Sequence, residues 1–244
     1  RTLDKNSISD LTFDYSSESL LILDKNANEV QAINIKDTNK VQGNKLLGNI
    51  PGNHTGIIVT ETLFGTWGTE GFSVEGRAGG VGGTGTFSET GQIADVSGFS
   101  NWVYALASDK NQIYKFYNTG SAFESSLWLG ADLEVAESSL LGINGDVYVW
   151  SDTLYKFTKG RETDFYLRLD LEEPLETVKD LVVRPGGTFL YLLDSNNGRV
   201  LQITKEGLLE AQFTSSALKD AAALAVNTEE TKAFVLTDRE VLEV

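Results

Sequence analysis

The stretch Asp180-Leu-Val-Val-Arg-Pro-Gly-Gly-Thr-Phe-Leu-Tyr-Leu-Leu-Asp-Ser-Asn-Asn-Gly-Arg-Val-Leu-Gln-Ile203 decides the fold. It reads as a strand, a Gly turn, an aromatic and aliphatic strand that ends in Asp194, an Asn/Gly turn and a further strand. Four other segments restate its second half, at residues 20–33, 103–116, 147–157 and 234–244. A pattern that returns at a fixed long interval indicates a repeat architecture.

The interval between repeats identifies that architecture. The first apolar residue of the strand after the Asn/Asp turn is Val30, Ile113, Leu154, Val200 and Val241 in the five segments. The first gap is about twice the others, which predicts a further repeat near residue 72, where Gly71-Phe-Ser-Val74 lies. Six repeats then recur about every 42 residues, the length of a four-stranded propeller blade.

A second set of segments supports this interpretation. Asp10-Leu-Thr-Phe13 and Asp180-Leu-Val-Val183 precede the repeated strands at a constant distance, and each is predicted to be the innermost strand of its blade. Residues rich in turn formers follow at 15–19, 185–188 and 227–231. Helical repeats would need apolar residues at a 3.6-residue period, and only 216–225 hints at one.

The sequence therefore predicts an all-β protein, a six-bladed β-propeller of four-stranded antiparallel blades that forms one domain over residues 1–244. The expected blades cover residues 8–49, 50–90, 91–135, 136–175, 176–218 and 219–244. We expect residues 1–6 to complete the last blade and close the ring by pairing with residues 239–244, because an unpaired third strand would promote aggregation.

Composition narrows the classes of partner. The chain of 244 residues carries 35 acidic and 20 basic residues, a net charge of −15, and no basic cluster for nucleic acid. No apolar run approaches the length of a membrane span, so we expect a soluble domain without direct membrane insertion.

The absence of Cys excludes disulfides and thiolate sites but fixes no compartment; an extracytoplasmic location is slightly favoured. A chain that begins with Arg1 and lacks Met is expected to be part of a larger protein.

The sequence shows no catalytic constellation. The only histidine, His54, is expected to be a surface loop residue, and no Gly-x-Ser-x-Gly motif supplies a nucleophile. We therefore predict no catalytic residue.

The turns before the third strands supply the candidate ligand-binding residues. Because equivalent turns of all blades lie on one side of a ring, their polar side chains would form an acidic rim, suited to a basic partner or to a divalent cation such as calcium. The structural alternative is that Asp and Asn stabilise their own turns. The residues are Asp24, Asn26, Asp109, Asn111, Asp152, Asp194, Asn196 and Asp238.

Residues 65–85 hold nine glycines. Glycine supplies positive φ and close backbone approach, so the segment is either a blade with glycine-kinked strands or a loop with a binding role. In the second case Trp67 and Arg77 are the expected contact residues.

The blade at 180–203 resembles an NHL-type propeller repeat in its Gly turn, its strand that ends in Asp194 and its Asn/Gly turn before Arg199-Val200. The resemblance is weaker around Leu20 and Val103. It implies a six-bladed ring that usually binds other molecules. Related six-bladed lactonases hold a divalent metal in the channel with Glu, Asn and Asp ligands, and no positions here match their motifs.

Two functions follow from these observations. The first is a non-catalytic interaction or scaffold module that binds a protein, peptide or small ligand on one face. The alternative is a metal-dependent hydrolase, similar to a lactonase, with channel carboxylates as metal ligands. The fold alone does not choose between them.

Overall fold

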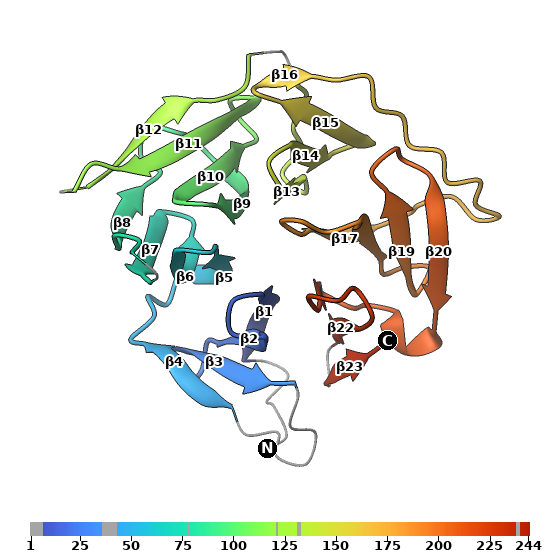
Figure 1. Cartoon of the computed structure of the whole chain (residues 1–244), viewed down its shortest axis with the longest axis horizontal. Helices are drawn as coiled ribbons and strands as arrows, with labels where there is room; N and C mark the ends of the chain where they lie inside the picture. Colours follow the sequence, from blue (N-terminus) through green and yellow to red (C-terminus); the bar gives the residue numbers. More distant parts are fainter. Residues whose placement is uncertain (1–6, 36–42, 78, 121, 131–132, 238–239) are drawn as a thin grey trace.

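The computed structural model describes residues 7–35, 43–77, 79–120, 122–130, 133–237 and 240–244. Six antiparallel sheets surround a central axis (Figure 1), as the repeat interval predicted. Five sheets have four strands each, and the sixth has three strands within the described residues. The predicted pairing of residues 1–6 with the sixth sheet lies outside the described residues.

The strands follow the chain from the axis outward in every blade. In the first three blades these are β1 (Ile8–Asp14), β2 (Ser19–Asp24), β3 (Glu29–Asn34), β4 (Asn44–Gly48), β5 (His54–Val59), β6 (Leu63–Gly68), β7 (Gly71–Gly76), β8 (Gly83–Thr86), β9 (Ile93–Phe99), β10 (Trp102–Ala107), β11 (Gln112–Asn118) and β12 (Phe123–Leu127). In the last three they are β13 (Leu140–Ile143), β14 (Val147–Trp150), β15 (Leu154–Thr158), β16 (Arg161–Glu162), β17 (Val178–Val183), β18 (Phe189–Asp194), β19 (Arg199–Thr204), β20 (Leu209–Thr214), β21 (Ala223–Val226), β22 (Ala233–Leu236) and β23 (Val241–Glu243).

The second strand is strongly apolar in five of the six blades because it is covered on both faces by the neighbouring blades; β6 of the second blade, with its two glycines, is the exception. Every residue of β22 is buried, and so are five of the six residues of β2 and of β18. This double burial explains why the sequence shows continuous apolar runs here instead of an alternating pattern.

Each pair of neighbouring blades encloses one apolar cluster, and six such clusters complete the ring. The cluster between the last and first blades joins Leu11 and Phe13 to Ala223 and Phe234. The rings of Phe13 and Phe234 stack with their centroids 6.5 Å apart. Apolar packing therefore joins the two ends of the ring in the described part of the chain.

The segment at 216–225, which hinted at a helix, contains only the short 3-10 helix η1 (Ser216–Leu218) before β21. No helix among the described residues is long and apolar enough to cross a membrane.

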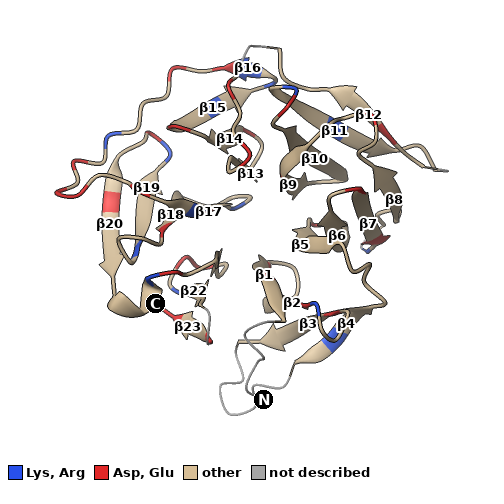
Figure 2. Ribbon diagram, turned by 180° about the vertical axis from the view of Figure 1, so that it is seen from behind, with Lys and Arg blue, Asp and Glu red and all other residues tan. Residues whose placement is uncertain are grey.

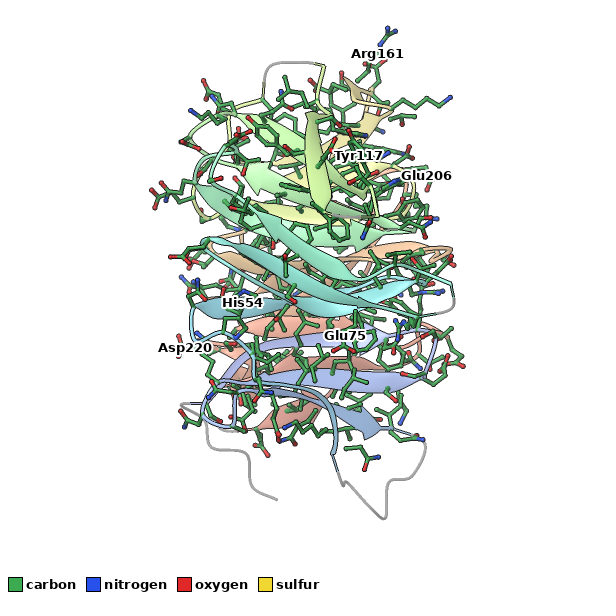
Figure 3. All side chains as sticks on the ribbon, turned by 90° about the vertical axis from the view of Figure 1, so that its left-hand side faces the viewer. His54, Glu75, Tyr117, Arg161, Glu206 and Asp220 are labelled. Atoms are coloured by element: carbon green, nitrogen blue, oxygen red, sulfur yellow. The ribbon has the colours of Figure 1, made fainter. Side chains whose placement is uncertain are left out.

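Strand order gives the ring two different faces. Because successive strands are antiparallel, the turn between the second and third strands lies on the same side as the connection to the next blade. We call this side the connector face and the other side the opposite face. In the edge-on view of Figure 3, His54 and Asp220 lie toward the connector face, and Glu75 and Glu206 lie toward the opposite face.

Candidate binding face and axial cavity

Those predicted rim residues that the structure describes lie on the connector face, and most of them bond to the protein itself. Asp24 accepts a hydrogen bond from the Ala27 backbone N–H at 3.0 Å. Asp152 accepts one from the Tyr155 hydroxyl at 2.9 Å. Asn26 lies in the turn between β2 and β3. Asp238 lies outside the described residues.

Two rim residues tie their turn to a connection between blades. The carboxylate of Asp109 accepts the N–H of Gln92 at 2.7 Å, and the side chain of Asn111 accepts the N–H of Val135 at 3.0 Å. Asn111 also adopts a left-handed φ of 50°, a conformation that Asn tolerates. These bonds give both residues a structural role in holding the connector face together.

Asp194 is fully buried and faces no solvent. It forms an ion pair with Arg199 at 2.9 Å and also accepts hydrogen bonds from Asn197 and from the N–H of Thr177. Arg199 in turn donates to the backbone carbonyl of Pro174. This network fixes the turn of the fifth blade to the connection that precedes it, so Asp194 is unavailable to an external ligand.

The glycine-rich segment forms strands, with β6, β7 and β8 covering most of it. Trp67 lies on β6 and lines the axial cavity, where its indole covers Gly56. A Cβ at Gly56 would come within 2.1 Å of the indole nitrogen, so this contact requires glycine. Of the two interpretations left open by the sequence, the structure supports the blade with glycine-containing strands.

Arg77 forms a bidentate pair with Asp14 on the first blade, with N–O distances of 2.6 and 2.8 Å. Its guanidinium also donates to the Thr60 carbonyl. Burial raises the pKa of Asp14, but the hydrogen bonds from Arg77 and from neighbouring serines outweigh it and hold that pKa below its usual value. Arg77 thus joins two blades on the opposite face.

The structure corrects the expected position of His54. This histidine is the first residue of β5, is buried, and forms a 2.8 Å hydrogen bond with the Thr66 hydroxyl. Burial lowers its pKa. The sequence suggested a loop because Pro51 and Gly52 precede it, and the Thr66 partner on the next strand was not visible from local composition.

Three aspartates that the sequence analysis did not assign as site residues line the axial cavity: Asp10, Asp95 and Asp180. They occupy the innermost strands of the first, third and fifth blades. The cavity has a volume of about 450 Å³ and receives residues from all six innermost strands. Each carboxyl is half-buried, so it is enclosed by the ring while part of its surface stays open to the cavity.

All three carboxylates bond in the same way. One oxygen accepts the N–H of the following residue, and the other accepts an N–H from the innermost strand of the next blade. The second donors are Ile57, Leu141 and Leu224, at 2.6, 2.7 and 2.6 Å. We call these three arrangements the aspartate clasps. They join the first blade to the second, the third to the fourth, and the fifth to the sixth.

The enclosure of these carboxyls changes their protonation. Burial, with the charge of Asp180 adding to it, raises the pKa of Asp10 to about 8 against the bonds from Ile57 and Leu11. Burial raises the pKa of Asp95 to about 7 and that of Asp180 to about 6. The three groups disfavour one another's ionisation because they face one small cavity.

A sequence signal for the clasps exists. The three aspartates are spaced by 85 residues, which is two blades, and each precedes Leu or Val. The residues that donate the second N–H, Ile57, Leu141 and Leu224, come directly after Gly56, Leu140 and Ala223, so they lie in apolar stretches. Because the aspartates recur only in every second blade, the period of one blade that defines the fold does not reveal them.

Each oxygen of the three axial carboxyls accepts one backbone N–H, which uses one of its two lone pairs. The described residues contain no group of three or more His, Cys, Asp or Glu side chains arranged to hold a metal ion.

The two faces of the ring differ in charge. Among described residues, the turns of the connector face and the parts of the connections that lie on it carry eleven acidic residues: Glu70, Glu89, Asp109, Glu134, Glu137, Asp152, Glu172, Glu173, Glu176, Asp220 and Glu240. The basic residues there are Lys25, Lys110 and Lys219. The connection at 163–177 begins at the opposite face, where Arg168 bonds to Gly207 and Leu209, and reaches the connector face only in its second half. The described turns of the opposite face are nearly neutral. Their acidic residues are Glu18, Glu61, Asp146, Glu206, Glu229 and Glu230, and their basic residues are Arg77, Lys159, Arg184, Lys205 and Lys232.

Comparison with known proteins places this chain among six-bladed propellers by structure alone. No known protein family and no curated protein matches the sequence. Virginiamycin B lyase from Staphylococcus aureus superposes with a TM-score of 0.62 at 11% identity, over 100% of this chain and 86% of the lyase. A gluconolactonase from Xanthomonas campestris superposes with a TM-score of 0.64 at 12% identity, over 97% of this chain and 85% of the gluconolactonase. A chain of the nidogen/laminin complex superposes with a TM-score of 0.60 at 12% identity, over 89% of this chain and 84% of that chain. Enzymes and a protein of a binding complex thus share the fold, which is all that such low identity shows.

Proposed function

We propose that this chain is a non-catalytic interaction module that binds a basic protein or peptide on the connector face. The charge difference between the two faces carries this proposal. A surface with many carboxylates and few cations produces a negative potential that attracts and orients a basic partner. The nearly neutral opposite face offers no comparable attraction.

The roles of the titratable residues near the axis also support a binding function. Asp10, Asp95 and Asp180 direct both oxygens to backbone N–H groups, and His54 is engaged with Thr66. A general base or nucleophile has to reach a substrate, whereas these groups join strands and blades.

A metal-dependent hydrolase similar to the lactonases is the second candidate. The convergence of three carboxylates on one axial cavity favours it. We rank this hydrolase below the binding function for two reasons. The carboxyl oxygens already accept hydrogen bonds, and the described residues contain no set of ligands for a metal ion.

Two matched charge reversals test the proposed function. The connector-face variant combines Glu70→Lys, Glu89→Lys and Glu134→Lys, and the opposite-face variant combines Glu61→Lys, Glu75→Lys and Glu206→Lys. All six side chains are exposed, and both variants change the net charge equally. Binding of fluorescein-labelled octalysine is measured by fluorescence anisotropy at low salt.

We expect the connector-face variant to bind octalysine about tenfold more weakly than the wild type, because each exposed ion pair contributes roughly 0.5 kcal/mol. The opposite-face variant should lose much less. Equal losses in the two variants would show that only the net charge matters, and the proposed binding face would be wrong.

A further inference from the structure

The connector face is hollowed between the fourth and fifth blades. The outermost strand of the fourth blade, β16, has only two residues, and the chain then continues for fifteen residues, 163–177, before β17. This connection runs along the outside of the ring (Figure 1). It alternates apolar and polar residues. Its apolar side chains pack against the apolar cluster between the fourth and fifth blades: Phe165, Leu167, Leu169, Leu171 and Leu175.

The connection takes the place of a full outer strand, and a crevice of about 940 Å³ remains beside it. The crevice has an apolar floor, to which Trp150 and Leu140 contribute from the fourth blade and Leu169 and Leu171 from the connection. We call this space the blade 4–5 crevice. Trp150, Leu140, Leu169 and Leu171 are only half-buried, so an apolar ligand group would remove further apolar surface from water.

The rim of the crevice is acidic. Glu137, Asp152 and Glu176 line it, with Lys179 as the only basic residue among its lining residues. The connection adds Asp170, Glu172 and Glu173, which are exposed. Figure 2 shows acidic residues in red along this connection. An apolar floor below a carboxylate rim complements a ligand that is apolar at its centre and positively charged at its edges.

We propose that the blade 4–5 crevice binds a peptide segment in which one or two large apolar side chains are flanked by Lys or Arg. The apolar side chains enter between Trp150 and the leucines of the connection, and the flanking cations meet Asp152 and Glu176. This inference rests on the proposed function, because it locates the anchoring point of the basic partner on the connector face. The volume is at the upper end of the range of pockets that enclose small ligands, and it is large enough for two side chains.

Three labelled peptides test the ligand class by anisotropy. The first is Gly-Lys-Lys-Leu-Phe-Lys-Lys, the second has Ser-Ser in place of Leu-Phe, and the third has Glu in place of every Lys. We expect the first to bind the wild-type chain at least tenfold more tightly than the second, and the third to show no binding. Equal binding of the first two would overturn the inference but leave the proposed function intact.

A blocking variant tests the position of the site. Thr153 lines the crevice, so Thr153→Trp fills the space with an indole. The control is Thr69→Trp, in the equivalent turn of the second blade, where the side chain is exposed. Thermal unfolding establishes that both variants are folded, and Asp152→Asn serves as a second variant that removes charge without adding bulk.

The Leu-Phe peptide should bind wild type and Thr69→Trp at least tenfold more tightly than the Ser-Ser peptide, and this difference in affinity should disappear in Thr153→Trp. Asp152→Asn should lower the affinity for the Leu-Phe peptide severalfold. If the advantage survives in Thr153→Trp, the apolar anchor lies elsewhere and the inference is wrong. If both lysine peptides bind the connector-face and opposite-face variants equally, the proposed function itself fails.

Discussion

Replacement of Asp10 by asparagine tests the electrostatics of the axial cavity. The pKa of Asp10 rises from 3.8 to about 8 in the folded chain. An acid with a higher pKa in the folded state binds more protons there than in the unfolded state. Its contribution to stability therefore falls as pH increases from the unfolded pKa through the folded one. Wild-type stability should decrease between pH 5 and pH 8.

The expected size of this effect follows from the pKa. Three pH units of differential protonation correspond to on the order of 4 kcal/mol for Asp10. Single domains typically have a free energy of unfolding of about 5 to 15 kcal/mol, so this change would be a large part of the total. Asp95 and Asp180 should add smaller contributions of the same sign, since burial raises their pKa values less. Asp14, Glu61 and Lys179 also line the cavity and complete its set of charges.

Urea unfolding at pH 5, 6, 7 and 8 measures the effect. The asparagine of Asp10→Asn is neutral at every pH. The free energy of unfolding of this variant should therefore decrease substantially less between pH 5 and pH 8 than that of the wild type. It should be less stable than the wild type at pH 5, where the asparagine N–H₂ replaces one accepting oxygen. Glu206→Gln, an exposed substitution, is the control and should follow the wild type. A wild type as stable at pH 8 as at pH 5, with Asp10→Asn showing the same dependence, would refute the description of the cavity.

Three further outcomes are expected from thermal or chemical unfolding. Arg199→Ala should cost about 3 to 5 kcal/mol because it leaves the carboxylate of Asp194 buried without its cation; a loss below about 1 kcal/mol would contradict the buried pair. Gly65→Ala should lower the melting temperature by several degrees, because a Cβ there would lie 2.0 Å from the carbonyl oxygen of Ser73, a backbone atom; an unchanged melting temperature would show that the strands adjust without cost. Deletion of residues 1–6 should also lower the melting temperature if this segment closes the ring, and the closure prediction fails if the truncated chain melts with the full one.

The repeat signal predicted the fold well because it arises from double burial. Central strands such as β2 and β18 need apolar residues on both faces, and a Gly, Asn or Asp turn has to follow. These requirements recur in every blade and produce a period that is visible in one sequence. Even the poorly matching second blade was located, because Gly71–Gly76 falls at the predicted interval.

The site was less accessible to sequence analysis. The composition of the turns predicted an acidic side of the ring, but it could not show that Asp194 is buried beside Arg199. The clasps depend on N–H groups of another blade, about 45 residues away, and backbone donors leave no mark in the sequence. The blade 4–5 crevice depends on the shortness of β16, which becomes apparent only once strand lengths are known.

The aspartate clasps divide the ring mechanically into three pairs of blades. Each clasp crosses one seam, and the seams between the second and third, fourth and fifth, and sixth and first blades have none. Resistance to shear should therefore alternate around the circle, and the three seams without a clasp should yield under load before the three that have one. A ligand in the blade 4–5 crevice would bridge one of the seams without a clasp, so its binding should reduce the mechanical compliance of the whole ring.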